Sequence, residues 1–215
     1  IDTHVLEKII ESAGITKDDF VLEIGPGIGT MTQYLCENAR QVMAVEIDDN
    51  LIPILQDTLS AYDNVTVVNQ DILKLDIAKT AQEYNDGKPI KVVANLPYYI
   101  TTPIIMGLFE SHVPLESITV MVQKEVACRL MARPGVADYG AITASVAYYG
   151  QVRLLFHVSR GCFLPAPDVD SAVIGIEPRP RADVPRQDYT RIVRALFAQR
   201  RKTVQNNLKN SLQMK

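Results

Sequence analysis

The sequence has no tryptophan and is poor in cysteine and histidine, with three of each in 215 residues. Cys36, Cys128 and Cys162 are an odd number without a closely spaced pair, which argues against a disulfide framework or a zinc site. The histidines are too scattered to suggest a metal cluster. We therefore expect no metal in the functional site, and this use of cysteine indicates a reducing cytoplasm.

Long apolar runs are also missing. The longest are short, such as Val92-Val93-Ala94, which argues against a membrane-spanning helix. The first residues, Ile1-Asp2-Thr3-His4, have neither the basic start nor the apolar stretch of a secretory signal. With 47% hydrophobic and 22% charged residues, the composition is that of a soluble globular protein whose core needs no disulfide or metal.

Basic residues are scarce in the first part of the chain, and acidic residues are scarce in the last. Residues 1–178 carry a net charge of −11, whereas residues 179–215 carry +8. This split favours a polyanion bound on one side of the molecule, although a solvated surface helix explains a charge run equally well. We predict a main domain over residues 1–178, followed by a linker and the first part of a basic helical domain over residues 179–215. Its predicted RNA-binding residues are Arg200, Arg201, Lys202 and Lys209.

Short apolar strands alternate with helical segments along the main domain. We expect strands at residues 20–24, 41–46, 65–69, 91–95 and 117–122, and helices at 5–12, 30–38, 51–60, 102–110 and 124–131. This alternation predicts an α/β fold with a parallel, Rossmann-like sheet and flanking helices. An antiparallel hairpin at 152–158 and 171–177 is expected at the far edge, and a basic helix at 189–212. Ligands bind beyond the carboxyl ends of the strands in such sheets.

A glycine-rich turn follows the first predicted strand. Gly25, Gly27 and Gly29 allow a tight turn and a close approach of a ligand to the backbone. The spacing is G-x-G-x-G rather than the G-x-G-x-x-G of dinucleotide loops, and Pro26 removes an N–H donor. Glu23, ahead of the loop, would repel a pyrophosphate but could orient an amine. A plain turn is the alternative interpretation.

Two more acidic residues follow the next two strands. Glu46 can accept hydrogen bonds from both hydroxyls of a ribose, and Asp71 can accept one from the exocyclic amine of an adenine. Each of them alone could equally be a helix cap. Together with the glycine turn they describe an adenosine across consecutive strand ends, with Ile47 and Ile72 beside the base. An adenosyl ligand without phosphates, on a loop that begins with an acid, indicates S-adenosylmethionine.

The run Asn95-Leu96-Pro97-Tyr98 follows the fourth strand. Pro97 restricts Leu96 to an extended backbone, which points the Asn95 side-chain oxygen and the Leu96 carbonyl outward beside the Tyr98 ring. Two oxygen acceptors on the N–H groups of a base amine favour its pyramidal form, whose lone pair can attack a sulfonium methyl. Alignment and electrostatics then suffice without a strong base. An ordinary turn is the alternative interpretation.

A second aromatic residue is presented by the run Phe163-Leu164-Pro165-Ala166-Pro167. Two prolines stiffen this loop, and Phe163 opposite Tyr98 would supply the second face for a base drawn out of its stack. A core position at a hairpin bend explains Phe163 equally well. The candidate catalytic residues are therefore Asn95, Leu96, Tyr98 and Phe163. The candidate cofactor-binding residues are Glu23, Gly25, Gly27, Glu46, Ile47, Asp71, Ile72 and Asn95.

These motifs resemble the rRNA adenine N6-dimethyltransferases over nearly the whole chain. The resemblance is carried by the run from Glu23 to Gly29, by Glu46, Gln70-Asp71 and Asn95 to Tyr98, and by the pattern Phe163-x-Pro-x-Pro167-x-Val169-x-Ser171-Ala-Val173. It implies a Rossmann-like methyltransferase domain with a small helical C-terminal domain. It also implies cofactor contacts by Gly25, Glu46, Asp71 and Asn95, and a target adenine held by Asn95, Leu96, Tyr98 and Phe163. We expect a monomeric enzyme.

The small-subunit branch of this family implies dimethylation of two adjacent adenines in a hairpin near the 3′ end of 16S rRNA, in the immature small ribosomal subunit. It implies rRNA docking by the basic helix around residues 200–209. The family pattern has a Gly-Gln-Asn-Phe-Leu motif ahead of the matching part and further helices after it, so we expect a piece of a longer protein.

Three alternatives are kept. The first is the 23S rRNA dimethyltransferase of macrolide resistance, although the run at 95–103 is more similar to the small-subunit branch. The second is a non-catalytic ribosome assembly factor, against which the intact Asn95 and Tyr98 argue. The third is an NAD-dependent oxidoreductase, which the glycine spacing disfavours.

Overall fold

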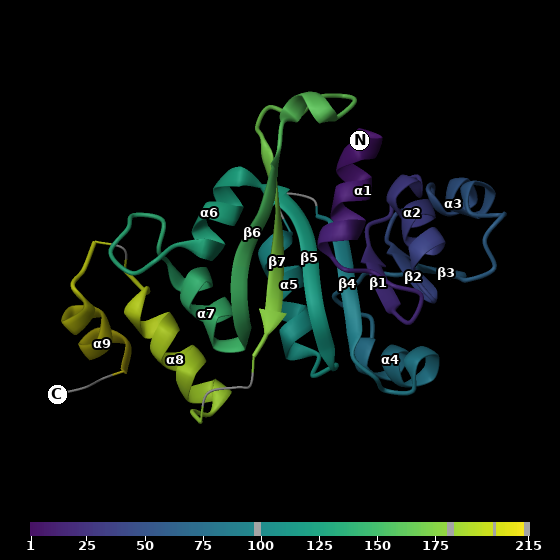
Figure 1. The fold of residues 1–215 in the computed structure, drawn as a ribbon. Helices are drawn as coiled ribbons and strands as arrows, with labels where there is room; N and C mark the ends of the chain where they lie inside the picture. The colour runs from purple at the N-terminus through teal and green to yellow at the C-terminus, as the bar shows by residue number, and fades with distance from the viewer. Residues whose placement is uncertain (97–99, 180–182, 200, 213–215) are drawn as a thin grey trace.

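The fold was analysed in a computed structural model that describes residues 1–96, 100–179, 183–199 and 201–212. In these residues, seven strands form one sheet in the order β3-β2-β1-β4-β5-β7-β6 (Figure 1). The strands β1 to β5 are parallel, whereas β7 pairs antiparallel with β5 and β6. Their bounds are β1 Phe20–Ile24, β2 Gln41–Glu46, β3 Val65–Asn69, β4 Ile90–Asn95, β5 Leu115–Gln123, β6 Gly150–Val158 and β7 Ser171–Pro178.

Helices cover both faces of the sheet, as the alternation of strands and helices predicts. One face packs against α4 to α7, and the other packs against α1 and α2. The bounds are α1 Thr3–Ser12, α2 Thr30–Asn38, α3 Ile52–Thr58, α4 Ile77–Asn85, α5 Thr101–Glu110, α6 Lys124–Met131, α7 Ala141–Tyr149, the 3₁₀ helix η1 Arg160–Cys162, α8 Arg186–Leu196 and α9 Val204–Leu212. The predicted α/β class and the antiparallel hairpin at the sheet edge are confirmed.

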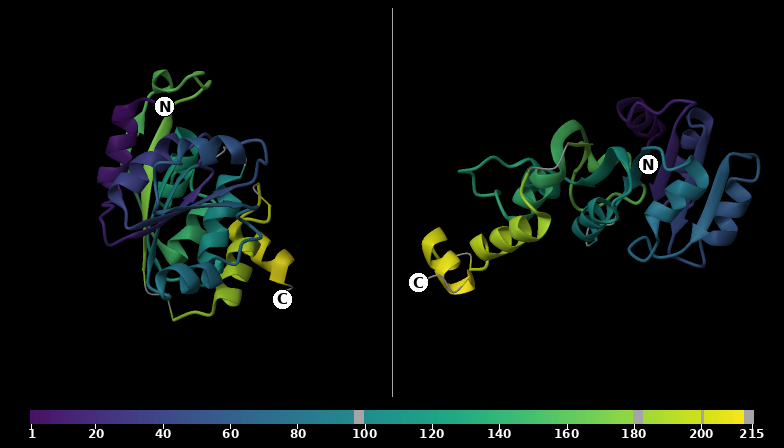
Figure 2. Two further views of the ribbon diagram at one scale, coloured as in Figure 1. Left: turned by 90° about the vertical axis from the view of Figure 1, so that its right-hand side faces the viewer. Right: turned by 90° about the horizontal axis from the view of Figure 1, so that it is seen from below.

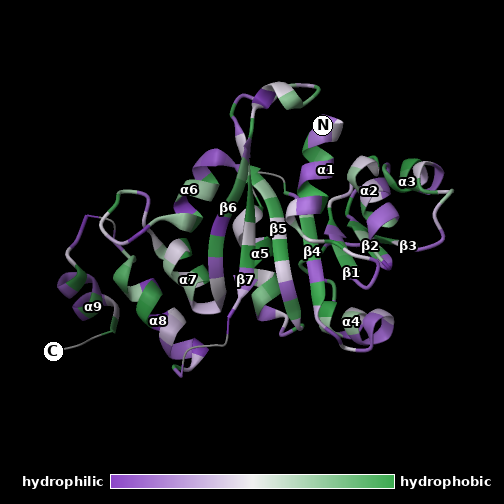
Figure 3. Ribbon diagram, in the orientation of Figure 1, coloured by the Kyte–Doolittle hydropathy of each residue, from purple (hydrophilic) through white to green (hydrophobic). Residues whose placement is uncertain are grey.

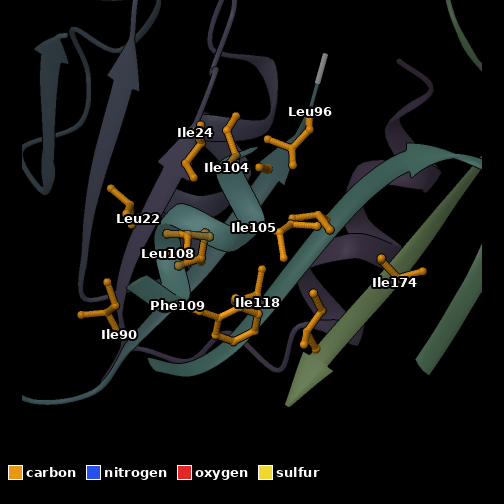
Figure 4. Packing of buried hydrophobic residues seen from close by; sticks show 14 of the residues in the cluster. Leu22, Ile24, Ile90, Leu96, Ile104, Ile105, Leu108, Phe109, Ile118 and Ile174 are labelled. Atoms are coloured by element: carbon orange, nitrogen blue, oxygen red, sulfur yellow. The ribbon is translucent and has the colours of Figure 1, made fainter. Parts of the chain in front are cut away.

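The central strands are apolar because both of their faces are covered. Every residue of β1 is buried. Figure 3 shows apolar residues along the middle of the sheet and polar residues on outer helices such as α9. In the close view of Figure 4, Ile24 from β1, Leu96 after β4 and Ile104 from α5 lie near one another. This packing fixes the strand ends from which the site is built.

The predicted single helix over residues 189–212 is wrong. The structure has two helices, α8 and α9, separated by residues 197–203. The reason lies in Asn207, which is 3% exposed and donates hydrogen bonds from Nδ2 to the carbonyls of Leu196 (2.8 Å) and Gln199 (3.1 Å). These bonds satisfy carbonyls at and beyond the end of α8, so α9 folds back against α8 instead of extending it.

The C-terminal helices are joined to the sheet domain through α7. The Tyr148 hydroxyl donates to the Val184 carbonyl and the Tyr189 hydroxyl to the Ala144 carbonyl, both at 2.7 Å. The view from below in Figure 2 shows α8 and α9 at the opposite end of the molecule from α1 and α2. None of the helices in the described residues is both long and apolar enough to cross a membrane.

Candidate active site

The strand ends form one edge because the parallel strands are in register. Ile24 pairs with Val45, Glu46 pairs with Asn69, and Asn95 pairs with Met121 of β5. The carboxyl ends of β1 to β4 therefore lie side by side. Ligands of parallel α/β sheets bind at this edge.

The turn after β1 leaves open space beside two glycines. Gly25 and Gly27 have φ angles of 68° and 62°, and a Cβ atom built on either would meet nothing within 4 Å. A Cβ at Gly29 would instead lie 3.1 Å from Leu55 Cδ2, because α3 packs there. Gly29 thus serves packing, whereas Gly25 and Gly27 leave room for a ligand against the backbone.

The Glu46 carboxylate holds two loops together and is 6% exposed. Its Oε1 accepts hydrogen bonds from the backbone N–H groups of Ile47 (2.8 Å) and Asp48 (3.0 Å). Its Oε2 accepts one from Gly27 N–H at 3.2 Å. A carboxylate has about four lone-pair positions, so the carboxylate keeps one for a ligand hydroxyl. The observed role of Glu46 is to shape the two loops, and its binding of a ribose stays a prediction.

Glu23 lies deeper, on the sheet face covered by α2. It is completely buried, and neither carboxylate oxygen has a hydrogen-bond partner within the described residues. Burial raises the pKa of Glu23 to about 8, the nearby Thr32 hydroxyl opposes this rise although it makes no hydrogen bond of normal geometry, and the Glu46 carboxylate adds to it. A buried acid with no partner is costly to fold, which makes Glu23 a candidate functional residue.

The predicted base-binding residues surround the ends of β2 and β3. Asp71 uses Oδ1 to accept from Leu73 N–H at 3.0 Å, and its Oδ2 lies 3.9 Å from Lys74 Nζ. Asp71 thus stabilises a local turn and does not cap a helix, because the next helix, α4, begins at Ile77 with Asp76 as its cap. Ile47 is 65% exposed, while Ile72 packs against the main core cluster. Of the two residues predicted to flank the adenine of the cofactor, Ile72 is therefore held by the core and Ile47 is open to solvent.

The end of β4 places Asn95 half-buried at the same edge. The next residue, Leu96, is fixed by its N–H, which donates to the Met121 carbonyl at 3.2 Å, and by a side chain that is 1% exposed. Only the Leu96 carbonyl is thus a candidate for binding, since its side chain belongs to the core. The predicted partner Tyr98 lies outside the described residues.

Phe163 follows η1 in the loop between β6 and β7. Its side chain is partly buried against the cluster formed with α1 and α2. The loop reaches the same sheet edge, because Ser171 at the start of β7 pairs with Gln123 at the end of β5. Phe163 is therefore partly a core residue, as the alternative interpretation expects, and its stacking role stays a prediction.

The predicted RNA-binding residues come much later in the chain than the residues of this sheet edge. Arg201, Lys202 and Lys209 are exposed, and Arg200 lies outside the described residues. A cavity of about 900 Å³ lies between the end of α5 and α8, lined by Arg186, Arg191 and Arg194 among others. These arginines contribute to the net charge of residues 179–215 but are not among the RNA-binding residues predicted from the sequence. Their spacing of three to five residues on α8 was the available signal.

The described residues contain no group of three or more histidines, cysteines or acids that could hold a metal ion. Cys36, Cys128 and Cys162 are free thiols. The residues that are present fit S-adenosylmethionine on two observations: the open space beside Gly25 and Gly27, and the unpartnered Glu23 below them.

Comparisons with known proteins show the family to which the chain belongs. The model of a family described as ribosomal RNA adenine dimethylase matches residues 1–215. Two curated relatives are named ribosomal RNA small subunit methyltransferase A. The one from Lachnoclostridium phytofermentans is 65% identical, over 98% of this chain and 74% of its own length. The one from Geobacillus thermodenitrificans is 51% identical, over 99% and 74%.

Two solved structures have the same fold at a TM-score of 0.78. A dimethyladenosine transferase from Plasmodium falciparum is 27% identical, covering 97% of this chain and 74% of its own. The 23S rRNA methyltransferase ErmE is 29% identical, covering 98% and 83%. The 23S alternative is therefore not favoured, because the small-subunit relatives are much more similar in sequence.

Proposed function

The chain belongs to the ribosomal RNA adenine dimethylase family, and we propose that its targets are two adjacent adenines in the 3′-terminal hairpin of 16S rRNA. It is an S-adenosylmethionine-dependent methyltransferase that dimethylates adenine in small-subunit rRNA. In our proposal it acts in the cytoplasm, as a monomer, on the immature small ribosomal subunit. The observation that carries this proposal is the position of Asn95 on the sheet edge that also holds the glycine turn and Glu46.

We assign the cofactor to the carboxyl ends of β1 to β3. Gly25 and Gly27 border the space that their missing side chains leave open. Glu46 offers its remaining lone pair to the ribose hydroxyls, and Asp71 offers Oδ2 to the adenine amine. Ile47 and Ile72 flank the base, and Glu23 below the turn faces the cationic end. Bound there, S-adenosylmethionine supplies a methyl group activated on a sulfonium.

We assign the target adenine to the end of β4. The Asn95 side-chain oxygen and the Leu96 carbonyl accept hydrogen bonds from the two N6–H groups of the base. These bonds favour the pyramidal amine and hold its lone pair in line with the methyl group. Tyr98 and Phe163 stack on the two faces of the ring. No residue in this assignment acts as a strong base.

We assign RNA docking to residues 179–215 and the chemistry to residues 1–178. The docking residues are Arg200, Arg201, Lys202 and Lys209. The exposure of Arg201, Lys202 and Lys209 and the net charge of +8 in this segment support the assignment. Phosphate groups on the rRNA supply the matching negative charge.

The test is methyl transfer from labelled S-adenosylmethionine to immature small subunits, followed by mass analysis of the 3′-terminal rRNA fragment. We expect dimethyladenine at two adjacent positions. Protein-stripped 23S rRNA serves as the second substrate. Labelling of 23S rRNA with none in small subunits would overturn the proposal, and so would labelled small subunits that lack paired dimethyladenines.

A further inference from the structure

Leu164 is the most exposed large hydrophobic residue among the described residues, at 96%. The next are Ile47 at 65%, Val204 at 59% and Ile28 at 57%. Leu164 lies in the loop between β6 and β7, directly after Phe163. Figure 1 shows this loop extending beyond the sheet, beside the start of α1.

The loop leading to Leu164 is held in place by hydrogen bonds. The Arg160 N–H donates to Asp170 Oδ1 at 3.0 Å, which ties the two sides of the loop together. The Cys162 carbonyl accepts from Asp2 N–H at 2.8 Å, which ties the loop to the start of α1. Phe163 turns back onto the core cluster. The frame therefore presents Leu164 outward while its aromatic neighbour stays partly covered.

Cationic side chains lie at the base of the same loop. A cleft of about 720 Å³ is lined by the two cations Lys124 and Arg160 and by four acidic residues, Glu125, Asp138, Asp168 and Asp170. Within the described residues, neither Lys124 nor Arg160 forms an ion pair. The projecting leucine suits the apolar space between stacked bases, and Lys124 and Arg160 are the two side chains lining this cleft that can contact a phosphate.

We propose that Leu164 inserts into the base stack of the substrate rRNA and fills the gap left by the extruded adenine, while Lys124 and Arg160 contact phosphates of the neighbouring backbone. The inference rests on the proposed function, which requires an adenine drawn out of its stack. Apolar side chains such as leucine are known to wedge between nucleic-acid bases in this way. Leu164 is then a positioning residue: it keeps the adenine out of the stack while Asn95 holds the amine.

The test compares Leu164→Ala with Leu164→Met, which keeps the apolar bulk, and with Leu154→Ala. Leu154 is a leucine of the same hairpin, 39% exposed on the edge strand β6. One readout is the single-turnover rate of methyl transfer to immature small subunits. The other is the fluorescence of 2-aminopurine placed at a target position in reconstituted subunits, which rises when the base leaves its stack. Urea unfolding checks that each variant is folded.

We expect Leu164→Ala to slow transfer at least about tenfold and to abolish most of the fluorescence rise. Leu164→Met and Leu154→Ala should resemble the unchanged chain in both readouts. Unchanged transfer and fluorescence in Leu164→Ala would overturn the inference. A loss of folding stability in Leu164→Ala without an effect on base extrusion would also overturn it. That result would show that Leu164 packs against the protein itself. Absence of transfer by the unchanged chain would overturn the proposed function itself.

Discussion

Two carboxylates on neighbouring strands show how burial decides what a single residue can do. Glu46 is buried, but three backbone N–H groups donate hydrogen bonds to its carboxylate oxygens. Glu23 is buried with no hydrogen-bond partner among the described residues, so its charged form has little to stabilise it. Ahead of ligand binding, the neutral form of Glu23 is therefore favoured at neutral pH, in keeping with its pKa of about 8.

Replacing Glu23 with Gln should change how stability depends on pH. The native pKa of about 8 exceeds the ordinary value of 4.5, so between these pH values the folded chain holds a proton that the unfolded chain has lost. Stability of the natural chain therefore falls as pH rises through this window. We expect Glu23→Gln to gain a few kcal/mol relative to it between pH 5 and pH 8, since one pKa unit is worth about 1.4 kcal/mol.

Urea unfolding at several pH values measures this difference. Glu11→Gln is the control, because Glu11 is an exposed acid on α1. Parallel pH profiles for the natural chain and Glu23→Gln would show that Glu23 is ionised in the folded state.

Sequence patterns located the acidic and amide residues better than they defined their roles. The sequence places Glu46 and Asn95 at strand ends because buried strands stop where polar residues begin. It does not reveal that the Leu96 side chain is in the core or that Phe163 is half covered. Those outcomes depend on packing between segments distant in the chain, such as α1 and the loop after β6.

At the scale of elements, the turn from β1 into α2 combines a left-handed backbone, which glycine adopts without strain, with free space. Gly27→Ala would place a methyl group at a φ of 62°, in the space beside the turn. We expect cofactor affinity, measured by isothermal titration, to fall at least about tenfold, because the ligand approaches the backbone there.

Gly135 provides the matched control for backbone strain. Its φ is 96°, its Cβ would also meet nothing within 4 Å, and it lies in the exposed segment between α6 and α7. Gly135→Ala should lose a similar amount of folding stability with no change in cofactor affinity. Equal affinities for the two variants would place the ligand away from the turn.

Regular elements were predicted best where their pattern is simple. The strands β1 to β3 and the helix α2 have the predicted bounds. The helix α7 was not expected, because it is almost wholly apolar and buried between the sheet and α8, so it lacks an amphipathic pattern. The break between α8 and α9 depends on Asn207, whose role as a cap comes from a tertiary contact.

At the scale of the whole molecule, acidic and basic parts lie at different ends. Residues 1–178 carry −11 and residues 179–215 carry +8. Figure 2 shows the C-terminal helices far from α1 to α3. Under the proposed function, the rRNA substrate is attracted at the basic end and methylated at the sheet edge.

Affinity for immature small subunits should fall steeply with salt, because each phosphate contact releases counterions. Replacing Arg201 and Lys202 together with Ala should reduce the slope of log affinity against log salt by about two. Filter binding at several salt concentrations measures the slope. Lys88→Ala, an exposed lysine of the acidic part, should leave it unchanged. A flat profile for the natural chain would contradict docking through the basic segment.

The proposed function assigns docking and chemistry to separate parts of the molecule, so one substitution at the end of β4 should remove the reaction and spare the binding. The measurement is the single-turnover rate of methyl transfer to immature small subunits by Asn95→Ala, beside Asn38→Ala, an exposed asparagine of α2. We predict that Asn95→Ala transfers at least about 100-fold more slowly while subunit affinity is kept. Transfer at the original rate would contradict the account.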